Sequence, residues 1–342
     1  MTRIAGPDRP VVITAAPHLK GRDSVPTIMW NVVGSLVPLV IVSAWFFGVS
    51  ALLVVLASVA GAVLTEHFIG RHGTLADGSA AITGILLGLT LPAGVPLWMP
   101  FLGGVFAIGI GKLLFGGLGH NIFNPALLGR AFLQAAFPVA LTTWPAVGGG
   151  FWTLRGDTFA FPFASARATD AVTAATPLGL WKFEQQSTEM GSLLFGSTGG
   201  SLGETSALLI LICGGYLAVR RYLDWRIPAS IFGTVAAFQG VLFALAPERY
   251  ASPAFMLLSG GLMLGAVFMA TDMVTAPVTK RGRVLFGIGI GLLVVVIRVW
   301  GGLPEGVMYA ILLMNALVPA INRVTQPRPF GAAATRSAEV AR

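Results

Sequence analysis

The sequence has 342 residues, of which 55% are hydrophobic and only 11% are charged. Soluble domains carry about 25% charged residues, so this composition excludes a soluble globular protein. Lysine and arginine outnumber aspartate and glutamate by 22 to 14, a balance that is typical of the cytoplasmic loops of membrane proteins and does not require nucleic acid. The single cysteine, Cys213, permits neither a disulfide nor a cysteine-ligated cluster within the chain.

Apolar runs predict ten membrane-spanning helices, close to the roughly 17–25 residues that cross a bilayer. The predicted helices cover residues 28–48, 50–70, 77–92, 97–116, 123–142, 205–219, 227–246, 253–271, 283–300 and 304–323. Proline, glycine and charged residues mark the joints, for example at residues 91–94 and 220–226. The expected fold class is an all-α polytopic membrane protein.

The ten predicted helices fall into two groups of five. The expected domains are an N-terminal cytoplasmic segment (1–27), a first membrane half (28–142), an extracytoplasmic loop (143–204), a second membrane half (205–323) and a cytoplasmic tail (324–342). Two similar halves with an odd number of spans have opposite orientations in the membrane. The helix count therefore favours two inverted five-helix repeats.

The distribution of basic residues predicts the orientation. With the N-terminus in the cytoplasm, 16 of the 22 lysines and arginines, Lys112 among them, fall on the cytoplasmic side, and Arg130 falls within a helix. The remaining five fall on the outer side: Arg155, Arg167, Lys182, Arg249 and Arg298. Because cytoplasmic loops are enriched in basic residues, both termini are expected inside and the loop at 143–204 outside.

A small, polar stretch within that loop has the order Asp-x-x-Thr-small-Ala-Thr, formed by Asp170, Thr173, Ala175 and Thr176. One interpretation is an ordinary loop of small residues. The other is that it resembles the acceptor motif at which a flavin transferase links flavin mononucleotide (FMN) to threonine through a phosphoester. The motif then assigns Thr176 as the attachment site and the other three as recognition positions. Ala174 departs from the pattern, which often has glycine there.

Such a flavin would suit a loop of this kind. The transferase works outside the cytoplasm, where the charge distribution places this stretch. A flavin accepts one or two electrons, and a covalent tether holds it without a large pocket. The protein then supplies position and electrostatics, and the ring supplies the redox chemistry.

Two further polar stretches lie at the predicted membrane edges. In the first, Asn124 precedes Pro125 and is expected to cap a helix, and Arg130 follows about two turns later, where it either bonds carbonyls at a helix break or stabilises a reduced flavin or a polar pathway. In the second, Asp272 and Thr275 either cap a helix or bind a flavin or a cation.

Asp77 opens the third predicted span with the same ambiguity between a cap and a ligand. Together the polar stretches give a candidate flavin or ion pocket. Its residues are Asn121, Asn124, Arg130, Asp272 and Thr275.

Several chemistries are not expected. The four histidines show no metal-ligand spacing, and no dinucleotide fingerprint, P-loop or nucleophile elbow is evident. We therefore expect no metal site, no catalytic residue of its own and no NAD(H) binding by this chain. Another subunit would have to handle the nucleotide.

These stretches together resemble one family. The similarity runs from about residue 16 to residue 323 and is carried by residues 16–18, 77–79, 86–92, 96–98, 119–126, 170–176, 270–277, 301–306 and Asn315. They are similar to the D subunits of Rnf electron-transport complexes and to the related B subunits of sodium-pumping NADH:quinone oxidoreductases. The length favours the D subunits, since the relatives usually have a longer N-terminal region.

The resemblance implies an inverted five-helix repeat like that of urea channels, in the inner membrane of a bacterium. It implies a complex that moves electrons between ferredoxin and NAD and translocates sodium or protons, with FMN on periplasmic Thr176 and a non-covalent riboflavin as a plausible second flavin. The implied partners are the A, B, C, E and G subunits, together with a flavin transferase. A solute channel of the same architecture, or a scaffold without cofactor, is the alternative.

Overall fold

The computed structural model describes residues 3–5, 10–12, 23–70, 74–162, 175–196, 198–204 and 206–327. Asp170 and Thr173 of the predicted flavin motif lie outside these residues. The helices and strands of the described residues are all helical elements except for one antiparallel pair of strands, β1 (Arg3–Ala5) and β2 (Pro10–Val12). The all-α expectation missed this pair because three-residue strands carry almost no periodic signal.

The first half of the membrane region contains helices within all five predicted segments. They are α1 (Val25–Phe47), α2 (Val49–Ile69), α3 (Ser79–Leu89), α4 (Trp98–Ile108) and α5 (Pro125–Ala136) with α6 (Pro138–Thr142). A 3-10 turn, η1 (Thr74–Asp77), precedes α3, and α4 continues as the π-helix η2 (Gly109–Leu113).

The second half likewise has helices within each predicted segment. They are α9 (Ala207–Val219), α10 (Arg226–Leu245), α11 (Pro253–Leu258) with α12 (Leu262–Leu264) and the π-helix η5 (Gly265–Met269), α13 (Lys280–Trp300) and α14 (Val307–Thr325). Two of the ten predicted spans are broken rather than continuous. Phe137 separates α5 from α6, which begins at Pro138, and Gly260, with a φ of 68°, lies between α11 and α12.

Five of the described helices are long and apolar enough to cross a membrane: α1, α2, α10, α13 and α14. Shorter apolar helices pack against them: α3 and α4 contact α2, and α9 contacts α1. This arrangement is that of a polytopic membrane protein.

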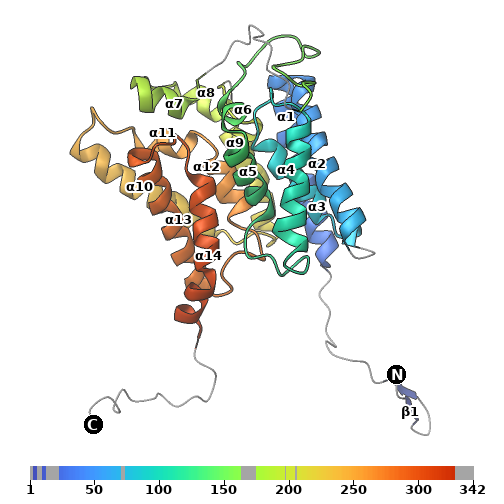
Figure 1. Ribbon diagram of the computed structural model, residues 1–342. Helices are drawn as coiled ribbons and strands as arrows, with labels where there is room; N and C mark the ends of the chain where they lie inside the picture. The colour runs from blue at the N-terminus through green and yellow to red at the C-terminus, as the bar shows by residue number, and fades with distance from the viewer. Residues whose placement is uncertain are drawn as a thin grey trace, which may run out of the picture.

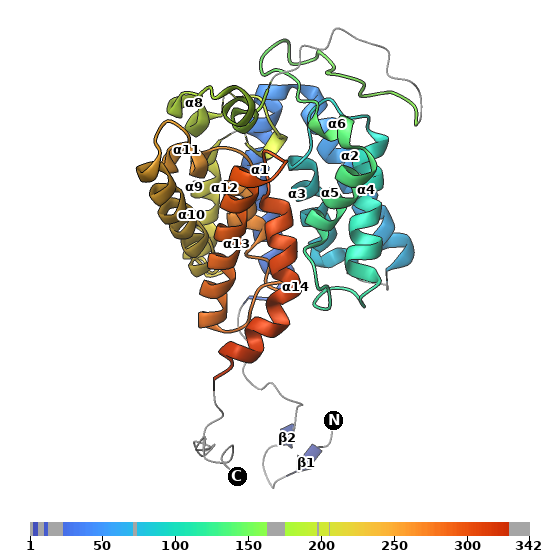
Figure 2. The ribbon, with the colours of Figure 1, turned by 60° about the vertical axis from the view of Figure 1, so that its left-hand side comes forward.

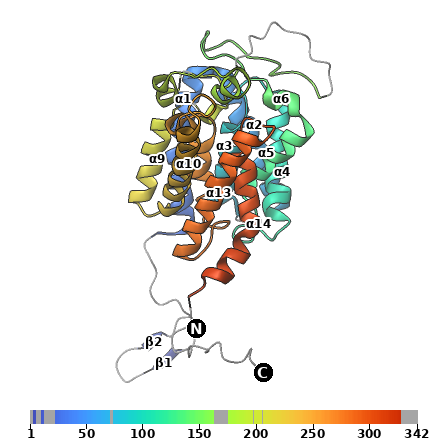
Figure 3. The same cartoon turned by 90° about the vertical axis from the view of Figure 1, so that its left-hand side faces the viewer.

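Helix packing relates the two halves of the chain. Within the first half α2 packs mainly on α3 and α4, and within the second half α10 packs mainly on α13. Between the halves, α1 contacts α9 and α5 contacts α14. Figures 2 and 3 show α9, α10 and α13 on one side and α2, α4 and α5 on the other, with α14 between them.

Glycines permit the close approach of α2 and α4. A Cβ at Gly61 would overlap the carbonyl oxygen of Phe101, and one at Gly104 would overlap that of Ser58. Small residues let helix backbones approach in this way in membrane proteins, where van der Waals contact holds helices together.

The segment predicted as an extracytoplasmic loop is partly structured. It contains α7 (Pro177–Gly179), the π-helix η3 (Leu180–Glu184), α8 (Met190–Phe195) and the 3-10 turn η4 (Leu202–Glu204). Leu202 is fully buried, and its N–H donates to the carbonyl of Leu91 at 3.1 Å. The end of this segment therefore belongs to the core, which the sequence reading did not anticipate.

The bundle has two chemically different ends. Helices α7 and α8 lie at one end, which we call the Thr176 end, and α14 ends at the other (Figure 1). The second end, which we call the basic end, gathers Arg226, Lys280, Arg281 and Arg323 around one surface hollow.

Candidate functional site

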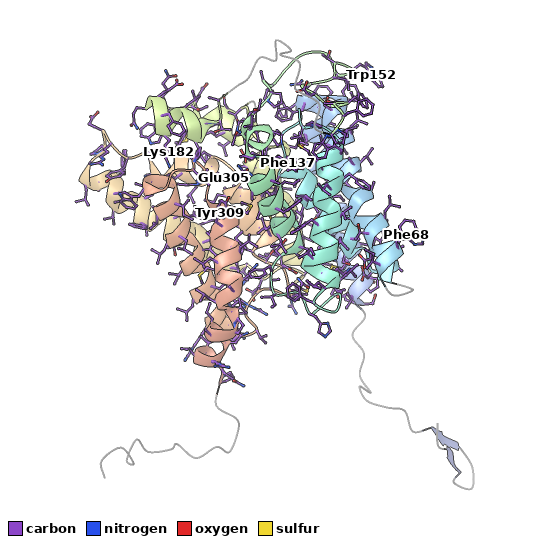
Figure 4. All side chains as sticks on the ribbon, in the orientation of Figure 1. Phe68, Phe137, Trp152, Lys182, Glu305 and Tyr309 are labelled. Carbon is purple, nitrogen blue, oxygen red and sulfur yellow. The ribbon has the colours of Figure 1, made fainter. Side chains whose placement is uncertain are left out.

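A large cavity at the Thr176 end brings Thr176 together with residues far away in the sequence. We call it the Thr176 cavity; it has an empty volume of about 1740 Å³, open to the outside. Arg130 and Gln134 of α5, Glu204 of η4 and Glu305 before α14 supply its polar wall. Trp144, Phe183 and Tyr309 supply aromatic side chains, and Figure 4 shows Tyr309 close to Glu305.

Thr176 occupies a helix start at the edge of this cavity. It has extended backbone angles and is the N-cap of α7, and the N–H of Gly179 donates to its Oγ1 at 3.1 Å. Pro177 follows at the first helical position, where its missing N–H costs nothing. The cap fixes the direction of the hydroxyl. Ala175 lines the same cavity and is exposed.

An ion pair forms part of the polar wall of this cavity. Nη2 of Arg130 lies 3.1 Å from Oε2 of Glu305, and Nη1 donates to the carbonyl of Thr90 at 2.7 Å. The other oxygen of Glu305 accepts the N–H of Gly261 at 2.5 Å. Both side chains are mostly buried, at 11% and 22% exposure. Donors from α5 and from the turn before α12 therefore hold both oxygens of this side chain.

Glu204 lies next to this ion pair and has a different environment. Its carboxyl is hydrogen-bonded by Ser201. Burial, together with the neighbouring charge of Glu305, raises the pKa of Glu204 to about 8, against the opposing effects of Ser201, Arg130 and Arg298. A carboxyl group in this state is protonated at neutral pH.

A second cavity lies at the basic end, with an empty volume of about 790 Å³. We call it the Asn124 cavity. Its polar residues are Ser79, Thr83, Lys112, Asn121, Asn124, Tyr222, Thr271 and Asp272. Apolar side chains such as Ile82, Leu86 and Phe268 form the rest of the wall. The two cavities are thus at opposite ends of the bundle.

Asn124 connects the two halves of the chain at this cavity. Its Oδ1 accepts the N–H groups of Ala126 and Leu127 at 3.0 and 3.3 Å, which confirms the predicted N-cap of α5. Its Nδ2 donates to the carbonyl of Met269 at the end of η5, at 3.1 Å. The residue therefore stabilises α5 and orients η5 against it.

Asp272 does not cap a helix, contrary to one of the sequence alternatives, because α13 begins only at Lys280, with Thr279 as its N-cap. Asp272 lies in a turn in which Val274 N–H and the Thr275 hydroxyl donate to its carboxylate at 3.3 and 3.1 Å. Asn121 also hydrogen-bonds it. Burial raises the pKa of Asp272, although these three hydrogen bonds oppose the change.

A buried ion pair adjoins the Asn124 cavity. Nζ of Lys112 lies 2.5 Å from Oε1 of Glu66 and 2.6 Å from Oγ of Ser79, whose own hydroxyl donates to Asp77 at 2.5 Å. The Lys112 and Glu66 side chains are 3% and 0% exposed. The sequence counted Lys112 among the basic residues of the cytoplasmic side, and the structure buries its side chain inside the bundle. The π-helix η2 continues α4 and carries this residue into the interior.

The structure divides the residues that the sequence grouped into one pocket. Asn121, Asn124 and Asp272 share the Asn124 cavity, and buried Thr275 lies behind Asp272. Arg130 instead lines the Thr176 cavity.

The sequence reasoning missed five polar side chains that adjoin the two cavities. They are Glu66, Lys112, Glu204, Glu305 and Arg298. A charged residue within or beside an apolar segment was the available signal for each of them.

The fold and these two cavities define a helical polytopic membrane protein with a polar chamber at each end of its bundle. Its sequence matches the NQR2, RnfD, RnfE family over residues 12–331, and the chain belongs to this family.

Several relatives are similar over nearly their whole length. The D subunit of the proton-translocating ferredoxin:NAD(+) oxidoreductase complex of Clostridium ljungdahlii is 40% identical, over 93% of this chain and 96% of its own. The D subunit of the Na(+)-translocating ferredoxin:NAD(+) oxidoreductase complex of Acetobacterium woodii is also 40% identical, over 94% and 95%. The D subunit of an ion-translocating oxidoreductase complex of Stutzerimonas stutzeri is 42% identical, over 91% and 93%.

Proposed function

We propose that this chain is the D-type membrane subunit of an ion-translocating ferredoxin:NAD oxidoreductase complex, and that it carries FMN as a phosphoester on Thr176. The observation that carries the proposal is the position of Thr176. The last residue of the Asp-x-x-Thr-small-Ala-Thr pattern lines a large cavity that contains aromatic, basic and acidic side chains. The names of the relatives support the assignment to such a complex, and the sequence motif supports the assignment of FMN.

The Thr176 cavity fits a flavin. Trp144, Phe183 and Tyr309 offer aromatic faces for an isoalloxazine ring. Arg130, at the cavity wall, would stabilise negative charge on a reduced ring. The ester oxygen at Thr176 remains an acceptor for the Gly179 N–H, so attachment does not require loss of the cap. When bound, the flavin supplies one- and two-electron transfer.

The Asn124 cavity suits a second, non-covalent flavin such as riboflavin. A flavin ring has hydrogen-bond donors and acceptors on one edge. The Asn124 amide has a second N–H besides the one that bonds Met269, and the amide oxygen of Asn121 is an acceptor. Ile82, Leu86 and Phe268 supply apolar surface. The same cavity could hold a translocated cation beside Asp272. Flavin extraction from the purified complex separates these two uses.

The packing supports two inverted five-helix repeats. The second and fourth segments pack together in each half, as α2 with α4 and as α10 with α13. The first segments, α1 and α9, contact each other, and so do the fifth, α5 and α14. The fifth segments also begin at opposite ends, because Asn124 before α5 lies at the basic end and Glu305 before α14 at the Thr176 end. An inverted repeat has these relations.

The proposed setting is the inner membrane of a bacterium, with both termini in the cytoplasm and Thr176 on the periplasmic side. The basic end supports this orientation, because Lys and Arg favour the cytoplasmic face. The proposed partners are the lipid bilayer, the A, B, C, E and G subunits and a flavin transferase. Relatives named for protons and for sodium are equally similar, so either cation fits the proposal.

Denaturing gels with ultraviolet illumination test the cofactor assignment. The chain is co-expressed with its flavin transferase as wild type, Thr176→Ala and Thr143→Ala. Thr143 is a matched control, because it is an exposed threonine of the same cavity outside the motif. We expect fluorescent wild-type and Thr143→Ala bands and a dark Thr176→Ala band. A dark wild type, with the transferase active on a control substrate, would overturn the proposal and favour a solute channel.

A further inference from the structure

The Thr176 cavity contains two carboxyl groups that its proposed cofactor does not explain. Glu204 and Glu305 both line the cavity. A Cβ added at Gly261 would overlap Oε1 of Glu305 and lie 3.5 Å from Oε1 of Glu204. The two oxygens are therefore within about 6 Å, a separation at which two like charges disfavour each other strongly in a protein interior.

The hydrogen bonds distinguish the two carboxyl groups. Glu305 accepts hydrogen bonds from the guanidinium of Arg130 and from the N–H of Gly261, so both of its oxygens are occupied by donors. Among the residues that the structure describes, Ser201 is the only side chain that hydrogen-bonds the carboxyl of Glu204. Glu204 is therefore the member of the pair on which a proton is stabilised.

Arg298, the other buried cation near the two carboxyl groups, does not hydrogen-bond either of them. Its Nη1 and Nη2 donate to the carbonyls of Met256 and Ser259 at 2.6 and 3.0 Å. Its Nε has no partner among the described residues, and the side chain is buried. Arg298 therefore acts on Glu204 and Glu305 only at longer range. It would stabilise a carboxylate at Glu204 when the proton leaves, without preventing the proton from binding.

We propose that Glu204 and Glu305 form a proton-binding site in the wall of the Thr176 cavity, in which Glu204 takes up and releases the proton. When a group in the cavity becomes basic, the O–H bond of Glu204 breaks, the proton passes to that group, and a carboxylate remains. A hydronium ion of the solvent that enters the open cavity then returns a proton to Glu204 and is left as water. The proposal rests on the proposed flavin only for the identity of the basic group, since proton binding needs the protein alone.

Infrared spectroscopy of the purified complex tests this site. The carbonyl stretch of a protonated carboxyl is followed as the pH is raised, in H₂O and D₂O, for wild type, Glu204→Gln and Thr176→Ala. We expect a protonated-carboxyl signal that disappears with a midpoint near pH 8 and that is absent from Glu204→Gln. Thr176→Ala should retain it, because the site does not depend on attachment of the flavin.

Two further variants sharpen the assignment. Glu184→Gln is the matched control, because Glu184 lines the same cavity but is exposed, so its signal should equal wild type. Glu305→Gln removes the neighbouring negative charge and should move the midpoint to lower pH. An unchanged signal in Glu204→Gln, or no carboxyl that titrates near pH 8, would overturn the proposal. Gel fluorescence of the same samples reports separately on the flavin, so the two proposals fail independently.

Discussion

The guanidinium of Arg130 lies 3.1 Å from the carboxylate of Glu305, and this ion pair joins α5 of the first half of the chain to the start of α14 in the second. The two residues are 175 positions apart in the sequence. The same guanidinium also donates a hydrogen bond to the carbonyl of Thr90, the residue just after α3. One side chain thus connects three segments at the wall of the Thr176 cavity.

Loss of this guanidinium should destabilise the bundle. Arg130→Ala removes the partner of a mostly buried carboxylate and of the Thr90 carbonyl, and we expect a loss of about 3 kcal/mol in the free energy of unfolding. Thermal unfolding in detergent, followed by circular dichroism, measures the change. Arg249→Ala, at an exposed position, is the control and should unfold like wild type. Equal transitions for both variants would show that the ion pair adds no stability.

The buried pair of Lys112 and Glu66 should behave as a unit. Lys112→Met leaves the fully buried Glu66 carboxylate without its cation, and we expect a loss of about 3–5 kcal/mol or failure to accumulate in the membrane. The double variant Lys112→Met/Glu66→Gln removes both charges and should recover most of that loss. Membrane yield and thermal unfolding measure both. A double variant no better than Lys112→Met would contradict this account.

The two asparagines of the Asn124 cavity should separate structure from flavin binding. Asn124→Ala removes the cap of α5 and the bond to Met269, so we expect a loss of about 1–2 kcal/mol together with less non-covalent flavin. Asn121 does not cap a helix, so for Asn121→Ala we expect mainly a lower content of bound flavin. Extracted flavin per chain and the apparent Tm are measured together. Unchanged flavin content in both variants would remove the asparagines from a flavin site.

Stability should fall as the pH rises across the range in which Glu204 titrates. The folded protein retains this proton up to about pH 8, whereas an unperturbed glutamate releases it near 4.5. The folded state therefore binds more protons between these values, and its stability decreases with rising pH there. We expect the Tm of wild type, relative to Glu204→Gln, to decline from pH 4.5 to 8 and then level off. Parallel curves for the two proteins would contradict a raised pKa.

The contact of α2 with α4 should not tolerate a methyl group at Gly61. A Cβ there would overlap the backbone oxygen of Phe101, so Gly61→Ala must separate the two helices, and we expect a loss of about 2–3 kcal/mol. Gly34→Ala is the matched control, because a Cβ at Gly34 of α1 has nothing within 4 Å. That variant should be neutral or stabilising by up to about 1 kcal/mol. Equal loss in both would point to helix propensity and not to packing.

The sequence by itself determined the class of the protein and the position of its helical segments. Apolar runs are a local property, since the bilayer requires consecutive apolar residues and internally bonded backbone. The N-cap at Asn124 is also a local feature, because the N–H groups that its side chain binds are only two and three residues further along the chain. The motif that names Thr176 is likewise contiguous.

Only the tertiary structure decided which polar residues share a site. Asn124 is the N-cap of α5 and Arg130 lies six residues later in the same helix, yet the two residues line cavities at opposite ends of the bundle. Glu204 and Glu305 approach each other although about a hundred residues separate them. Lys112 lies within the predicted span 97–116, but its pairing with Glu66 of α2 was not predicted. Side-chain pairing across helices depends on how the two halves pack, and that information is spread over the whole chain.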